Sequence, residues 1–217
     1  MPHSPPPRVR NRLSPDERIS EIMAITRQML SEKGYEKIIT SEVADRCGIS
    51  EATIYKYFAS KRDLLVRVAE QWFEEILAVD DQHATTTKGI RDRLRRLVWE
   101  SLAVVRKEPS LTRFVLMELR SDPSYRSMHI YTLNRKFTGK ISAVLNQAVK
   151  TGEFRNDVPV SLLRDMIFGC IEHQIWTFLR GEGDFSVDLA ADGISNVIYR
   201  GMATTRPAPE SQNQVSA

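Results

Sequence analysis

The sequence predicts an all-α fold, with a small N-terminal helix-turn-helix domain at residues 14–60 and a larger helical bundle at residues 61–203. Apolar residues recur at intervals of three and four along most of the chain, which is the spacing of one helix face. No alternation long enough for a β-strand interrupts them. Near Gly48, two short helical patterns are separated by only a tight turn, as in a helix-turn-helix. The patterns together give about nine helices.

The first helix is expected at residues 15–33. Ser14 is a suitable N-cap, Pro15 fits the first helical position, and Glu17 stands where a capping box needs an acid. Gly34 follows the last apolar residue of the pattern and is expected to end the helix.

The next three helices are indicated by their caps. Thr40 is expected to cap the second helix, Gly48 to end it in the left-handed conformation, and Ser50 to cap the third only two residues later. Ser60 is expected to cap the fourth, with Asp63 at the capping-box position. That fourth helix carries a long apolar stripe that continues to residue 77.

The remainder of the chain is predicted to form further helices bounded by proline or glycine. Their expected ranges are 90–105, 111–119, 124–151, 159–180 and 187–202. Residues 1–13, a Pro-rich basic arm with Arg8, Arg10 and Arg12, and residues 204–217 have little to bury, so both are expected to be disordered.

The composition limits the class of protein. Of 217 residues, 41% are hydrophobic, which is enough for a substantial core. The chain has no run of about 18 apolar residues and no apolar stretch after the N-terminal charges, so neither a membrane span nor a secretory signal is predicted. We therefore expect a cytoplasmic protein. The net charge of +3 permits an anionic partner without arguing for one.

The residue types that carry catalysis or bind metals are scattered. Cys47 and Cys170 are far apart in sequence and form no CxxC pair, so we expect neither a disulfide nor a zinc site, and both are expected to be small core residues. The histidines belong to no HExxH motif, and neither GxSxG nor a P-loop occurs. No enzyme activity, cofactor or metal is predicted.

The third helix of the chain, which is the second helix of the helix-turn-helix, is the predicted DNA-reading (recognition) helix. In this motif the second helix enters the DNA major groove, and its N-terminal residues reach base edges. Ser50, Glu51, Ala52, Thr53 and Lys56 lie on or near its exposed side. An acid at 51 either accepts a hydrogen bond from a base such as cytosine, through N4, or stabilises its own helix N-terminus. Tyr55 and Lys61 are predicted to meet phosphates.

The stretch GISEATIYKYF followed by SKRDLL resembles the TetR/AcrR transcriptional regulators, in cap, turn and aromatic positions together. The resemblance covers residues 14 to about 77. It implies a homodimer that binds a palindromic DNA operator, most simply as a repressor, and that is released by a small-molecule inducer. By position, it implies phosphate contacts for Thr40, Thr53, Tyr55 and Lys61 and a base-reading surface at Ser50, Glu51, Ala52 and Lys56.

The same resemblance implies that the two last helices form the dimer interface. The residues expected there are Leu162, Met166, Cys170, Ile194, Val197 and Ile198. Gly169 and Gly193 either allow close helix approach or are merely tolerated.

An apolar inducer cavity is expected among the helices of the bundle, although each of its candidate residues also fits a core role. The candidates are Trp72, Trp99, Phe114, Met117, Met128, Tyr131, Phe137, Phe168, His173 and Trp176. The segment GEFRNDVP, with MIFG at 166–169, resembles TetR-type regulators of fatty-acid degradation that sense acyl-CoA. Four arginines either supply charge to such a ligand or are solvated on helix surfaces: Arg113, Arg120, Arg126 and Arg135. The alternative function is a helical ligand- or protein-binding module without specific DNA readout.

Overall fold

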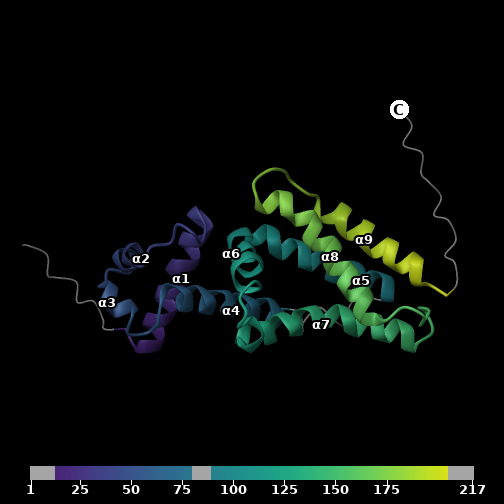
Figure 1. Ribbon diagram of the computed structural model, residues 1–217, viewed down its shortest axis with the longest axis horizontal. Helices are drawn as coiled ribbons and strands as arrows, with labels where there is room; N and C mark the ends of the chain where they lie inside the picture. The colour runs from purple at the N-terminus through teal and green to yellow at the C-terminus, as the bar shows by residue number, and fades with distance from the viewer. Residues whose placement is uncertain (1–12, 80–88, 205–217) are drawn as a thin grey trace, which may run out of the picture. The chain divides into compact units, whose positions relative to one another are not determined.

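A computed structural model describes residues 13–79 and 89–204. Within these ranges it contains nine α-helices and no strand beyond one isolated bridge between Phe154 and Ala203, so the all-α prediction is confirmed (Figure 1). The chain divides into two compact units, with the boundary between Ala69 and Glu70 rather than after residue 60. The predicted disordered basic arm with its three arginines and nearly all of the predicted tail lie outside the described residues.

The first unit begins with α1 (Pro15–Lys33), whose ends follow the predicted signals. The backbone N–H of Glu17 donates to Ser14 Oγ over 3.2 Å, and the Ser14 N–H donates to Glu17 Oε2 over 2.8 Å. This capping box satisfies N–H groups that the first turn of a helix cannot bond internally. Gly34 ends the helix with a φ of 80°.

The helix-turn-helix consists of α2 (Thr40–Cys47) and α3 (Glu51–Ile54). Gly48 ends α2 in the left-handed conformation, with φ 63° and ψ 41°, as its sequence position predicts. The predicted cap at Thr40 is wrong, because Ile39 holds the N-cap position and Thr40 is already helical. The Thr40 hydroxyl instead bonds side chains from the other side of the turn.

α4 (Lys61–Val79) starts at the predicted cap: the Asp63 N–H donates to Ser60 Oγ over 3.1 Å. Its first turns close the core of the first unit, together with side chains from all three preceding helices. The largest side chains fully buried there are Ile22, Met29, Leu30, Ile38, Ile54, Phe58 and Leu64.

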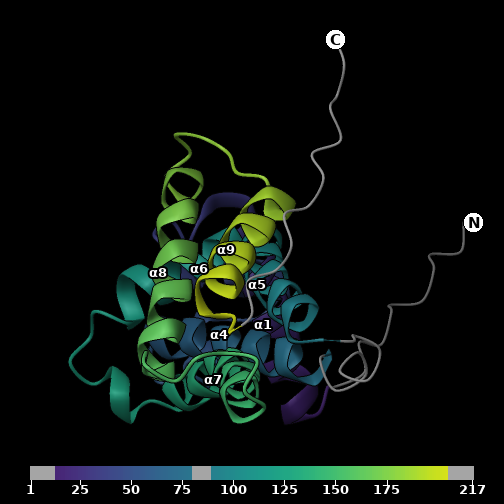
Figure 2. The same ribbon diagram turned by 90° about the vertical axis from the view of Figure 1, so that its right-hand side faces the viewer.

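The second unit contains the rest of α4 and the remaining helices. These are α5 (Ile90–Lys107), α6 (Pro109–Phe114), a π-helical turn (Val115–Leu119), a 3₁₀ turn (Tyr125–Ser127), α7 (His129–Lys150), α8 (Val160–Leu179) and α9 (Val187–Met202). α5 is the central element and packs against α7, α8 and most extensively α9. Figure 2 shows α8 and α9 side by side. Their inward residues, such as Ile167, Ile171 and Ala191, share one apolar core with Leu94 and Leu102 of α5.

Candidate functional site

The exposed surface of the helix-turn-helix is formed by α3 and the residues that follow it. Ala52 and Lys56 are exposed, whereas Ser50 Oγ and Thr53 Oγ1 lie 2.8 Å apart and bond each other. Ser50 occupies the N-cap position of α3 but its side chain makes no capping bond to a backbone amide. Short polar side chains therefore stand at the N-terminal end of α3, where a helix-turn-helix meets base edges.

A chain of hydrogen bonds joins α2 to α3 beneath this surface. Thr40 Oγ1 donates to Glu51 Oε1 and lies 3.0 Å from the Tyr55 hydroxyl. An ionised carboxylate only accepts, so the single Thr40 proton goes to Glu51 and the Tyr55 hydroxyl donates to Thr40. Thr40 is 7% exposed and Tyr55 48% exposed. Two hydroxyls predicted to contact phosphate are thus engaged within the protein, and Glu51 reaches α2 rather than its own helix N-terminus.

Lys56 and Lys61 have no carboxylate partner within the described residues. The two lysines are therefore available for an external anion.

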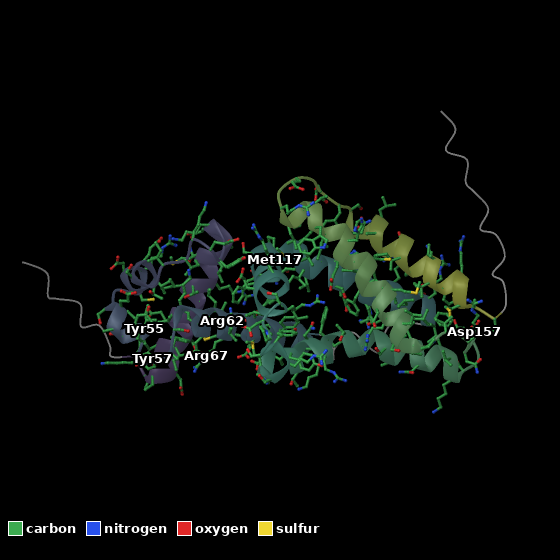
Figure 3. The ribbon with its side chains drawn as sticks, viewed as in Figure 1. Tyr55, Tyr57, Arg62, Arg67, Met117 and Asp157 are labelled. Atoms are coloured by element: carbon green, nitrogen blue, oxygen red, sulfur yellow. The ribbon has the colours of Figure 1, made fainter. Side chains whose placement is uncertain are left out.

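The aromatic residues that follow α3 differ in their surroundings. Tyr57 lies close to α3, as does Tyr55 (Figure 3). Phe58 is buried, with the guanidinium of Arg67 5.3 Å from the centre of its ring.

The second unit contains a cavity of about 490 Å³, within the usual range for small-molecule sites. α4, α5, the π-helical turn, α7 and α8 all contribute to its wall. Aromatic rings connect two sides of it: Trp72 meets Phe73 at 5.1 Å between centroids, and Phe73 meets Phe137 at 6.1 Å, both edge to face. The apolar part of the wall is completed by Ile76, Val104, Val105, Val115, Leu116, Tyr131, Phe168, Ile171 and Ile175.

Charged side chains form part of the same wall, and they are unequally paired. Arg120 on one side pairs with Glu172, and Arg164 pairs with Asp165 over 2.7 Å. Arg135 has no carboxylate partner within the described residues, and its guanidinium lies 5.9 Å from the centre of the Tyr131 ring. Three arginines against two acids leave one excess positive charge, so the wall favours an anionic group.

Of the side chains predicted for the cavity, Trp72, Tyr131, Phe137 and Phe168 line it. The remaining six lie elsewhere. Phe114 is in the core at 2% exposure, and Met117 is 44% exposed. Trp99 is 38% exposed, and its Nε1–H donates to Asp188 Oδ1 of α9 over 3.0 Å. The others outside the wall are Met128, His173 and Trp176.

Sequence reasoning missed several cavity residues that a helical spacing signal would have found. Ile76 follows Trp72 by four residues, so both face the same side of α4. Arg164, Phe168, Ile171 and Ile175 repeat at intervals of three and four along α8 and share one face. Once one cavity residue of a helix is known, the residues three or four positions away identify the rest of that helix face. A search limited to aromatic and methionine residues does not find them.

The opposite side of α8 and a face of α9 present apolar residues to solvent. Leu162 is 51%, Met166 49% and Val197 73% exposed. Cys170 is exposed on the same side, which contradicts its predicted core position, whereas Cys47 is buried as expected. Of the other residues predicted for a dimer interface, Ile194 is half-buried and Ile198 is buried within the chain.

The glycines on this surface have open space around them. A Cβ added at Gly169 or at Gly193 would meet no atom of the chain within 4 Å. Neither glycine therefore serves a close helix approach inside the chain.

The part of the chain that the structure describes has no cluster of three or more metal-ligating side chains. Its helices include none long and apolar enough to cross a membrane. His129 Nε2 lies 3.6 Å from Glu74 Oε1 on the protein surface, and His173 is exposed on α8.

Two family descriptions match the sequence. "Bacterial regulatory proteins, tetR family" matches residues 22–68, and "Tetracyclin repressor-like, C-terminal domain" matches residues 87–202, more than half of the chain. The first match covers the helix-turn-helix, and the second covers α5 to α9.

Curated relatives and a solved structure agree with these matches. The fatty acid metabolism regulator protein of Bacillus subtilis (strain 168) is 19% identical over 175 residues, covering 81% of this chain and 90% of the relative. The transcriptional repressor KstR2 of Rhodococcus jostii is 23% identical over 192 residues, covering 86% and 92%. The crystal structure of FadR from Bacillus subtilis in complex with stearoyl-CoA superposes with a TM-score of 0.71 at 20% identity, covering 84% and 98%.

Proposed function

This chain belongs to the TetR family of bacterial regulatory proteins, and on that premise we propose that it is a homodimeric repressor released from its operator by an anionic amphiphile. The protein is a DNA-binding transcriptional regulator with a ligand-binding domain. The proposal concerns what that domain binds, how the ligand acts, and which residues meet the DNA. We also propose that the protein works in the cytoplasm, where its operator DNA lies.

The DNA half of the proposal assigns α3 to the major groove. Ser50, Ala52 and Thr53 then face base edges, because they stand at the N-terminal end of the reading helix. Lys61 is a proposed phosphate contact, as its position implies. We also propose a phosphate contact for Lys56, in place of its expected role on the base-reading surface, since neither lysine is neutralised by a carboxylate of the described residues.

The ligand half rests on one observation: the excess positive charge in the wall of an otherwise largely apolar cavity. An apolar chain would lie among Trp72, Phe73 and Phe168, and an acidic head group would pair with Arg135. FadR from Bacillus subtilis was crystallised in complex with stearoyl-CoA, a molecule with both parts. A long-chain acyl-CoA is therefore the ligand we propose to test first.

The coupling between ligand and DNA runs through α4. This helix begins at Lys61, a proposed phosphate contact, and carries Trp72, Phe73 and Ile76 of the cavity wall. A ligand that displaces α4 changes the separation of the two reading helices in a dimer, and such coupling typically amounts to about 1–3 kcal/mol. The proposed dimer interface is the apolar surface formed by Leu162, Met166 and Val197.

The experiment that tests the proposal has two stages. Duplexes bound by the purified protein are selected from a randomised library, and the enriched sequence serves as the operator in fluorescence anisotropy at several salt concentrations. Stearoyl-CoA is then titrated into the complex beside free CoA and a non-ionic amphiphile of the same chain length. We expect stearoyl-CoA alone to lower operator affinity, by about 5- to 150-fold.

The Arg135→Ala variant should lose this response, while Arg126→Ala, which removes an equal charge outside the cavity wall, should keep it. A full response of Arg135→Ala, or an equal response to the non-ionic amphiphile, contradicts the anionic ligand. Failure of the protein to enrich any sequence favours the alternative of a ligand- or protein-binding module without DNA readout.

A further inference from the structure

The Glu51 carboxylate is held on one side only. Its Oε1 accepts a hydrogen bond from Thr40, and the described residues offer no other hydrogen-bond or charged partner to either carboxylate oxygen. Thr40 is 7% exposed, so the anchoring hydroxyl is fixed within the protein, whereas Glu51 itself is half-buried at the first position of α3. The second oxygen, Oε2, remains available to a hydrogen-bond donor.

The direction of the hydrogen bonds decides what this surface is able to recognise. The Tyr55 proton goes to Thr40 and the Thr40 proton goes to Glu51, so neither hydroxyl has a proton left for a phosphate oxygen. Glu51 itself is repelled by phosphates. The group that this arrangement suits is a neutral donor in the groove, not the DNA backbone.

Resting on the proposed placement of α3 in the major groove, we infer that Glu51 reads a cytosine in each half of the operator, with Thr40 as its positioning residue. Cytosine presents only its N4 amino donor in the major groove. Guanine presents two acceptors and thymine an acceptor with a methyl group, so both disfavour a carboxylate. Adenine offers an N6 donor, but its N7 acceptor lies beside that donor and repels a carboxylate. Thr40 and Tyr55 then orient the reader instead of contacting phosphate.

The test compares the base preferences of full-length variants, again by selection from a randomised duplex library. The wild-type protein should enrich one C·G pair at a fixed position in each half-site. Glu51→Ala should lose the preference at that position alone, by about 5- to 150-fold, the usual effect of one mismatched pair. Glu51→Gln should change the preference toward adenine, because an amide pairs with the N6 and N7 of that base.

Two variants of Thr40 separate positioning from phosphate contact. Thr40→Val removes the hydroxyl at nearly constant shape and should weaken discrimination at the same base pair, whereas Thr40→Ser keeps the hydroxyl and should preserve it. A phosphate contact predicts a different result, a similar loss of affinity for every sequence. Retained preferences at the other operator positions show that each variant is folded.

Identical preferences of the wild type, Glu51→Ala and Glu51→Gln at every position would overturn the inference while leaving the DNA-binding function intact. A uniform gain of affinity in both Glu51 variants would also overturn it, because the carboxylate would then only repel the DNA backbone. Absence of any enriched sequence with the wild type would contradict both the inference and the proposed function.

Discussion

The rings of Phe73 on α4 and Phe137 on α7 meet edge to face, with their centroids 6.1 Å apart. Both side chains line the cavity, and Trp72 extends the aromatic contact along α4. Aromatic pairs in this geometry contribute about 0.5–1.5 kcal/mol beyond their buried area. The position of α4 is therefore coupled energetically to the same wall that a ligand would touch.

Replacement of Phe137 by Leu should weaken ligand binding only slightly, but it should strongly reduce the effect of the bound ligand on operator affinity. Leu keeps an apolar wall but loses the ring contact that ties α4 to α7. We expect the dissociation constant for stearoyl-CoA, measured by calorimetry, to change by less than about fivefold, or 1 kcal/mol. The ligand-induced fall in operator affinity, measured by anisotropy, should shrink toward none. Phe137→Tyr keeps the ring and is the control, and a full response in Phe137→Leu would refute this role.

A charge on the outer side of α8 should separate the dimer. Met166 is 49% exposed in the single chain and belongs to the proposed interface, where an unpaired carboxylate is costly to bury. Met166→Glu should therefore be monomeric by analytical ultracentrifugation and bind operator weakly. Met117 is 44% exposed outside that surface, so Met117→Glu should remain dimeric. Equal masses for the two variants would place the interface elsewhere.

Removal of a phosphate-contacting lysine should change the salt dependence of DNA binding. Each lysine that neutralises one phosphate contributes about one unit to the slope of log affinity against log salt. Lys56→Ala and Lys61→Ala should each lower that slope by about one, with base preferences unchanged. Lys150→Ala, at the end of α7, removes the same charge from the other unit and serves as the control. An unchanged slope in Lys56→Ala would exclude it as a phosphate contact.

Local signals in the sequence were sufficient for most helix boundaries. Ser14 and Glu17 are three residues apart and bond each other, so their pattern alone locates the start of α1. Gly48 needs only its own backbone freedom to end α2. The predicted N-cap role of Thr40 was wrong because its hydrogen-bond partners, Glu51 and Tyr55, are 11 and 15 residues away. They reach it only once α2 and α3 have packed.

The cavity was predicted less well, because helical spacing shows which residues point inward but not which of them border empty space. Phe114 and Tyr131 are both aromatic residues of the bundle, yet Phe114 lies in the close-packed core and Tyr131 lines the cavity. Trp99 lies on the surface, where its indole bonds Asp188, an acid 89 residues away in the sequence. Such outcomes depend on how helices distant in sequence meet.

The two cysteines should differ widely in reactivity. Burial, reinforced by the negative charge of Glu21, raises the pKa of the Cys47 thiol to about 11. Since the thiolate is the reactive form, only about one Cys47 in a thousand is ionised at pH 8, against roughly a quarter of ordinary thiols. In the Cys170→Ser variant, alkylation at pH 8 should be at least about 100-fold slower in the native protein than in denaturant.

The alkylation rate of Cys47 should also depend on pH differently in the native and the denatured protein. Because the native pKa lies above the ordinary value, the native alkylation rate should keep rising, about tenfold per pH unit, from pH 8 to 10. The rate in denaturant should level off above about pH 9, where an unfolded thiol is already ionised. Iodoacetamide labelling followed by mass spectrometry measures both curves. A native rate that levels off near pH 9 would mean that Cys47 reacts from a locally opened state with an ordinary thiol pKa, and not from its buried position in the native core.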